Sequence, residues 1–168
     1  MFRANKEQQT SMVDRLCLLS DADRRELESS WAATFATDAF DRIDEEPFAV
    51  LFDKSKGRRN APVNVLVGAL MIKELLGVTD ERLVGDIKWD LRLQYALRTT
   101  SFLRQPVSLR TLARFRVRVY RHYLETGVDL IKQCVRGLAA HACAEMEIDD
   151  YSRRLVAPIS LWKARIIV

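Results

Sequence analysis

The sequence predicts an all-α protein: a helical bundle with a helix-turn-helix-like arrangement and a short, irregular or β-prone C-terminal tail. A chain of 168 residues is long enough for one domain with a sizeable core. Hydrophobic residues make up 48% and charged residues 30% of the chain, which excludes a disordered polypeptide. Only six glycines and four prolines occur, so a fold with many tight turns is disfavoured and long helices are favoured.

The N-terminal part predicts an acidic amphipathic helix. Residues 1–19 predict a short helix with a frayed start. Ser20 and Asp23 then form a capping box, and apolar residues recur at helical spacing from Asp21 to Ile43. Between Asp21 and Asp53 ten acids face three arginines, which gives this segment a net charge of −7.

The central part predicts two helices joined by a short turn. Pro62 follows a basic loop and stands where the first turn of a helix should begin. Val63–Leu76 is apolar almost all round, which predicts the buried central helix of the core. Gly77 is placed to end this helix and Thr79 to cap the next one, Asp80–Trp89. The result is the three-residue turn of a helix-turn-helix motif.

The C-terminal half predicts three more helices and a tail of different character. The helices are Leu91–Leu97, Leu109–Glu125 after the capping residue Ser108, and Val128–Met146 after Gly127. Residues 151–168 contain β-prone apolar runs. We therefore expect a helical domain over residues 1–150 and a separate tail over residues 151–168.

Several classes of protein are disfavoured by what the sequence lacks. No secretory signal is evident in the first twenty residues, and the longest apolar run, Val65–Ile72, is too short to cross a bilayer. Three cysteines at unrelated spacings argue against a disulfide framework or a zinc site. We find no phosphate-binding glycine loop, nucleophile elbow or metal-binding histidine pair. We expect a cytoplasmic protein with no cofactor, metal or membrane partner, and not an enzyme.

The positive charge is concentrated in one stretch. From Leu91 to Leu124 there are eight arginines and no acid, although the whole chain has a net charge of only +4. At about 100° per residue, four of these arginines share a face of about 80° on the helix after Ser108, opposite its apolar side chains. The planar guanidinium group binds phosphate, and also the edge of guanine, through two parallel hydrogen bonds. A polyanionic partner, such as double-stranded DNA, is therefore predicted, and the alternative is a solvated face satisfied by the acids of residues 21–53.

Charge and turn geometry favour different helices for the DNA contact. The turn favours Asp80–Trp89, but this helix carries Asp80, Glu81 and Asp86, which would repel phosphate. We give charge precedence and choose the helix from Leu109, with the basic loop as a second contact. The candidate DNA-binding residues are Arg110 and Thr111 nearest the bases, Arg114, Arg118 and Arg121 toward the backbone, and Lys54, Lys56, Arg58 and Arg59 of the loop.

Two motifs resemble the N-terminal helical domain of bacterial insertion-sequence transposases that have an acidic-triad catalytic core. They are LGVTDERL at residues 76–83 and SLRTLARFR at residues 108–116, which follow a basic loop and an apolar helix in the order found in that family. The similarity covers about residues 59–123. It implies binding to the terminal inverted repeats of a mobile element.

The resemblance also implies that the chemistry belongs to a ribonuclease-H-like domain, which holds two metal ions on three acids. The segment around Asp149 and Asp150 does not align with the first strand of that domain. We expect these residues to be ordinary acids at a helix end, and the alternative is that one of them is a relic of the first catalytic acid. We therefore expect a truncated transposase that lacks the catalytic triad, with residues 151–168 read partly out of frame. The alternatives are a helical protein–protein interaction module or an inhibitor of a full-length transposase, with a second copy or that transposase as partner.

Overall fold

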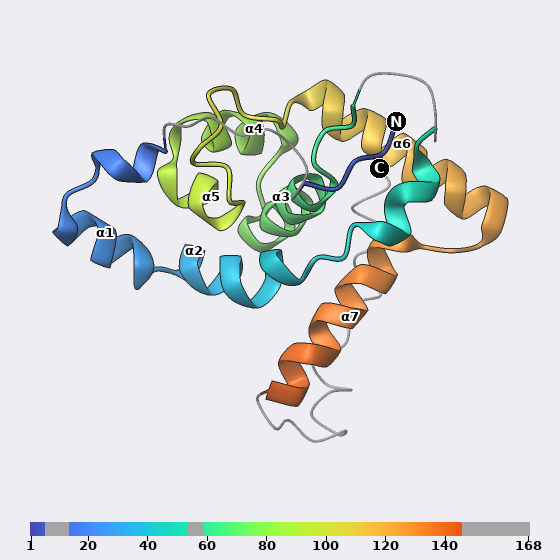
Figure 1. The fold of residues 1–168 in the computed structure, drawn as a ribbon. Coiled ribbons are helices and arrows are strands. Elements are labelled where there is room, and N and C mark those ends of the chain that lie inside the picture. Colours follow the sequence, from blue (N-terminus) through green and yellow to red (C-terminus); the bar gives the residue numbers. More distant parts are fainter. Residues whose placement is uncertain (6–13, 54–58, 146–168) are drawn as a thin grey trace. The chain divides into compact units, whose positions relative to one another are not determined.

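The computed structural model describes residues 1–5, 14–53 and 59–145, and every regular element in these ranges is helical (Figure 1). This confirms the all-α fold class. The helices are α1 (Asp21–Glu28), α2 (Trp31–Thr34), α3 (Val63–Leu76), α4 (Asp80–Trp89), α5 (Leu91–Ala96), α6 (Leu109–Thr126) and α7 (Leu130–Glu145). The β-prone tail and the predicted domain boundary at residue 150 lie outside the described residues.

The chain forms two compact units, Met1–Ala113 and Arg114–Val168. The first unit contains α1 to α5 and the start of α6. The second contains the rest of α6 and α7, which are separated at Gly127 with φ of +73°. The break predicted at this glycine is confirmed, and α7 begins two residues later than expected.

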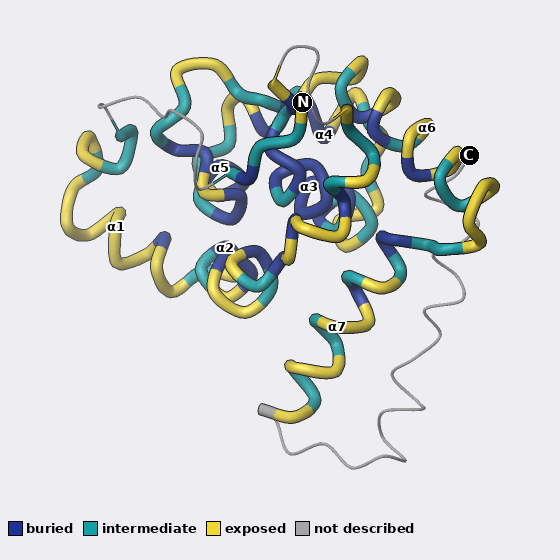
Figure 2. The backbone as a smooth tube through the Cα atoms, turned by 45° about the vertical axis from the view of Figure 1, so that its right-hand side comes forward, coloured by how far each residue is buried: buried dark blue, intermediate teal, exposed yellow. Residues whose placement is uncertain are grey.

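Helix α3 is the core of the first unit, as the sequence predicts. Eight of its fourteen residues are buried, and its tube is dark blue over most of its length (Figure 2). It begins and ends at the predicted residues. Gly77 has φ of +62°, and the amide of Val78 donates to the carbonyl of Lys73 at 3.3 Å. This is the left-handed helix end at which a residue without Cβ has no steric penalty.

The predicted helix Asp21–Ile43 is wrong as a single element. Helix α1 ends at Glu28, and a second helical segment starts at Trp31, which continues as a π-helical turn over Phe35–Ala39 and a 3₁₀ turn over Phe40–Arg42. The hydroxyl of Ser30 donates to the carbonyl of Leu27 at 2.6 Å and accepts from the amide of Ala32 at 3.3 Å. Serine hydroxyls that bond to the backbone in this way compete with the helical ladder and start a new helix.

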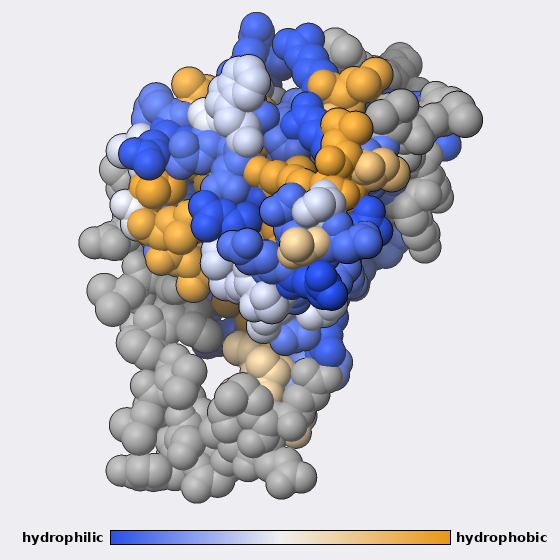
Figure 3. All heavy atoms as spheres, turned by 90° about the vertical axis from the view of Figure 1, so that its left-hand side faces the viewer, coloured by the Kyte–Doolittle hydropathy of each residue, from blue (hydrophilic) through white to orange (hydrophobic). Residues whose placement is uncertain are grey.

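Helix α1 contributes little to the core. All of its residues except Leu27 are exposed. The side of the molecule on which α1 lies shows hydrophilic side chains mixed with smaller hydrophobic patches (Figure 3). Ser20 caps the helix as predicted, since the amide of Asp23 donates to the hydroxyl of Ser20 at 3.2 Å and this hydroxyl donates to the carboxylate of Asp23 at 2.7 Å.

A buried carboxylate holds the start of α3. Glu45 is 9% exposed, and its Oε2 accepts from the amides of Val63 at 3.0 Å and Asn64 at 3.2 Å. Its Oε1 accepts from the amide of Asn5 at 2.8 Å. These bonds satisfy two amides at the helix N-terminus that have no partner within the helix, and the negative charge suits the helix dipole.

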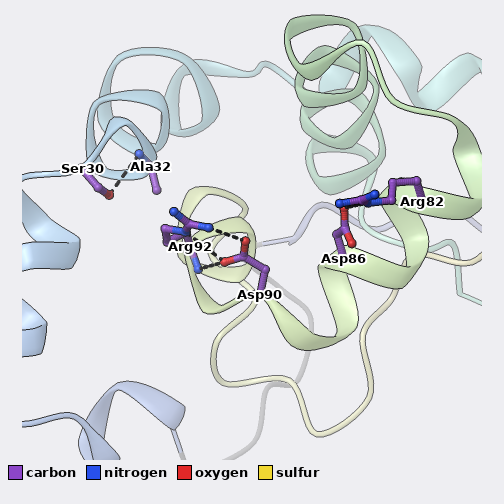
Figure 4. Close-up of polar contacts among 6 residues, drawn as sticks. All are labelled: Ser30, Ala32, Arg82, Asp86, Asp90 and Arg92. Atoms are coloured by element: carbon purple, nitrogen blue, oxygen red, sulfur yellow. Dashed lines mark hydrogen bonds and ion pairs between the residues drawn. The ribbon is translucent and has the colours of Figure 1, made fainter.

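The junction of α4 and α5 is held by side chains on both sides of the bend. Gln94 is 1% exposed, and its Nε2 donates to the carbonyls of Ile87 at 2.9 Å and Lys88 at 3.0 Å. Asp90 caps α5 by accepting from the amide of Arg92 at 2.8 Å, and the two side chains also pair (Figure 4). The bend is therefore specified by side chains and not by a flexible glycine.

Helix α5 ends with a left-handed residue that is not glycine. Arg98 has φ of +52°, and the amide of Thr99 donates to the carbonyl of Gln94 at 2.8 Å. The geometry is that of the α3 end at Gly77, but here the residue carries a side chain. Its guanidinium group pairs with Asp41 through contacts of 2.8 and 3.2 Å and lies over the ring of Tyr95.

Candidate nucleic-acid interface

Helix α6 starts with a local cap, as predicted. The hydroxyl of Ser108 accepts from the amide of Thr111 at 3.2 Å. The hydroxyls of the same two residues are 2.6 Å apart. In this structure the side chain of Thr111 therefore supports the helix start, and its predicted contact with a base stays a prediction.

The arginines of α6 lie on its exposed side. Arg110, Arg114, Arg118 and Arg121 are all exposed, and we call this set the basic face. The apolar residues opposite, Leu112, Phe115 and Val119, are buried. One continuous helix therefore presents four guanidinium groups, spaced about one turn apart, on the side away from its buried residues.

The predicted second contact is described only in part. Arg59 is exposed at the end of the basic loop, whereas Lys54, Lys56 and Arg58 lie outside the described residues. Beside it, Asn60 is buried, and its Oδ1 accepts from the amide of Arg3 at 2.8 Å. The backbone that follows Arg59 is thus tied to the N-terminal segment.

The rival helix α4 has the predicted acids, and two of them are paired. Asp80 lies 2.9 Å from Lys73, and Asp86 lies 2.9 Å from Arg82 (Figure 4). Glu81 is exposed at the start of the helix. These acids leave α4 without an excess of positive charge, so the electrostatic argument against this helix holds in the structure.

Two arginines of the stretch Leu91–Leu124, which contains no acid, are less available to bind phosphate than the sequence suggests. Arg92 pairs with Asp90, and Arg98 pairs with Asp41. In each pair the hydrogen bond that the guanidinium donates to the carboxylate raises the pKa of the guanidinium further above its usual range, although burial opposes this rise. Both acids lie outside Leu91–Leu124, so counting charges within the stretch could not reveal the pairs.

No group of three or more His, Cys, Asp or Glu that could hold a metal ion occurs in the part of the chain that the structure describes.

A family model described as a transposase domain (DUF772) matches residues 24–118, which is more than half of the chain. The chain belongs to this transposase-domain family. The matched range starts in α1, well before the motifs at residues 76–83 and 108–116, and includes both of them. No curated protein and no solved structure matches the chain.

The transposase-domain match includes the first three arginines of the basic face, Arg110, Arg114 and Arg118, and ends before Arg121. It covers the second part of α1, all of α2 to α5 and about the first half of α6. Among the described residues of this domain and its flanks, no helix has both the length and the apolar character that a membrane span requires.

Proposed function

We propose that this transposase-related protein binds double-stranded DNA through the basic face of α6 and recognises the terminal inverted repeats of a mobile element. The observation that carries the proposal is the alignment of four exposed arginines on one side of a helix whose other side is buried. Binding, and not strand cleavage, is the role we assign to the described residues.

Electrostatics favours phosphate as the partner of this face. Like charges one turn apart on a helix repel by a few tenths of a kcal/mol per pair, so the four arginines disfavour the isolated helix. Duplex DNA removes this repulsion because its negative phosphates neutralise the arginines, and each such contact also releases a counterion from the DNA. Arg110 lies in the first turn, where a helix inserted by its N-terminus brings side chains to the base edges.

The test is the salt dependence of binding to duplex DNA. Replacing Arg114 and Arg118 by Ala should weaken binding to all sequences and lower the slope of log K against log salt by about two, since each phosphate contact contributes about 0.9. Both residues are exposed, so we expect the melting temperature of the variant to stay within about 2 °C of that of the native chain.

The matched control removes two exposed positive charges from α4. The variant carrying Arg82→Ala and Lys88→Ala has the same net charge as the α6 variant and should keep the native salt slope. A reduced slope in the α4 variant together with a native slope in the α6 variant would move the interface to α4. If the native chain shows no salt-dependent retention on DNA, the protein–protein interaction module becomes the better interpretation.

A further inference from the structure

Helix α6 carries a third face, which is apolar and exposed. Val117, Tyr120 and Leu124 are 56%, 42% and 65% exposed, and Ala113 before them is also exposed. Their spacing of four, three and four residues places them in one row along the helix. At 100° per residue this row lies about 85° around the helix from the basic face and about 135° from the buried side. We call it the apolar row.

The apolar row differs from isolated surface apolar residues. Leu18 and Leu103 are 82% and 83% exposed, but neither belongs to a row on a helix. Single exposed apolar residues need no explanation, whereas a row with alternating spacings of four and three is the seam along which two helices pack. The expected occupant of this face is therefore another helix.

We infer that the occupant is α6 of a second copy, packed antiparallel across a two-fold axis when the protein is on DNA. This inference rests on the proposed DNA binding by the basic face. A partner seated in the apolar row lies beside the phosphates that contact the arginines. An acidic partner would be repelled by these phosphates, so the charge favours a helix that is itself basic on the DNA side.

Symmetry supplies that charge arrangement. In an antiparallel pair of identical helices the two-fold axis is perpendicular to the plane of the two helix axes. Any face on one side of that plane is therefore repeated on the same side by the second copy. The two basic faces then form one positively charged surface, whereas a parallel pair would place them on opposite sides.

The size of the row predicts that the pair forms on DNA and not in free solution. Three partly exposed side chains supply on the order of 300 Å² per copy, so a pair buries well under the roughly 1,200 Å² of a stable interface. In addition, the seam brings Arg114 of one copy near Arg121 of the other, which opposes pairing until phosphates lie between them. Free chains should accordingly be monomeric.

The experiment compares the full native chain with a variant carrying Val117→Asn and Leu124→Gln, both neutral and exposed. On a duplex long enough for two copies, sedimentation and gel shift should show native chains binding as cooperative pairs. The variant should bind as single copies, with half-saturation at a roughly tenfold higher concentration. The salt slope per bound chain should not change, because no arginine is altered.

A matched control replaces two exposed leucines outside the row, Leu18→Gln and Leu103→Gln, and should retain cooperative pairing. Native binding as single copies, or undiminished cooperativity in the row variant, would overturn the pairing while leaving DNA binding intact. Cooperativity lost in the control as well would show that the effect is not specific to the row, which also overturns it. If the native chain does not bind DNA at all, the proposed function fails and the pairing fails with it.

Discussion

Helices α3 and α6 differ in how much of their surface is buried, and this difference separates a helix that stabilises the core from a helix that presents an exposed surface. Helix α3 has eight of its fourteen residues buried and carries few polar residues, whereas α6 has one buried side and two exposed ones (Figure 2). Truncations in α3 should therefore change the free energy of unfolding, and truncations on the exposed sides of α6 should change binding. Unfolding and binding measurements on variants of each helix can test this difference.

The largest expected effect comes from the core side chains of α3. Leu70 is 2% exposed, so Leu70→Ala should lower the free energy of unfolding by about 2–5 kcal/mol through lost burial and the cavity left behind. Leu124 on α6 is 65% exposed, and Leu124→Ala should change the free energy of unfolding by less than about 0.5 kcal/mol. Urea denaturation of both variants checks this, and similar losses would remove the contrast between the two helices.

Removing the cap at the start of α3 should cost more stability than removing the cap at the start of α6. Glu45→Ala leaves three amides without their acceptor, two of them at the start of α3, and should cost about 2–3 kcal/mol. Ser108→Ala removes a local, exposed cap of α6 and should cost about 1 kcal/mol. Glu45→Gln should lie between native and Glu45→Ala, since one oxygen remains as an acceptor. A larger loss for Ser108→Ala than for Glu45→Ala would contradict this order.

Smaller changes in stability are expected at the two left-handed helix ends. Adding a side chain at Gly77 should destabilise the protein, and a glycine at position 98 should be more stable there than an alanine. Gly77→Ala places a Cβ in a left-handed conformation with open space around it, so the cost is in the backbone alone, about 1 kcal/mol. Arg98→Gly relieves the same strain that Arg98→Ala retains, and both lose the ion pair to Asp41. We therefore expect Arg98→Gly to be more stable than Arg98→Ala by about 0.5–1 kcal/mol in thermal denaturation. Equal stabilities would show that the conformation at Arg98 costs nothing.

The smallest expected effect is the loss of stability at low pH that comes from protonation of Asp90. Burial, the largest single influence, raises the pKa of Asp90, but hydrogen bonds and charge from Arg92 together outweigh it and hold this pKa below its usual value. A carboxyl group whose pKa is lower in the folded state stabilises the protein above its unfolded pKa, and this contribution disappears as the pH falls through the folded pKa. For such a partly exposed pair the contribution should stay below about 1 kcal/mol. Comparing native protein and Asp90→Asn at pH 7 and pH 2 measures it, since their stability difference should shrink at low pH.

The elements that sequence reasoning placed correctly are those with local signals. Gly77 and Thr79 mark the end of α3 and the start of α4 within a few residues of the turn, and both helices have the predicted bounds. The break at Ser30 was missed because apolar spacing continues across it. The sequence shows serine there, but not that its hydroxyl bonds to the backbone on both sides.

The remaining features depend on residues far apart in the chain. Glu45 caps a helix that starts 18 residues later, and Asp41 pairs with an arginine 57 residues away. Neither partner could be identified from local pattern. At the candidate interface the reverse holds, because the basic face of α6 follows from helical spacing alone, and Arg110, Arg114, Arg118 and Arg121 are exposed as that spacing requires.

The two segments that are joined by the ion pair between Asp41 and Arg98 also both approach Gly68. At Gly68 of α3 an added methyl group would lie 2.9 Å from the side chain of Leu97 and 3.0 Å from that of Phe40. Phe40 and Leu97 are the chain neighbours of the paired residues. The two segments therefore both lie against Gly68 in the core and are joined by the ion pair at the surface. Two attachment points at different depths resist twisting as well as separation. Amide hydrogens around Phe40 and Leu97 should accordingly exchange with solvent in one common opening event.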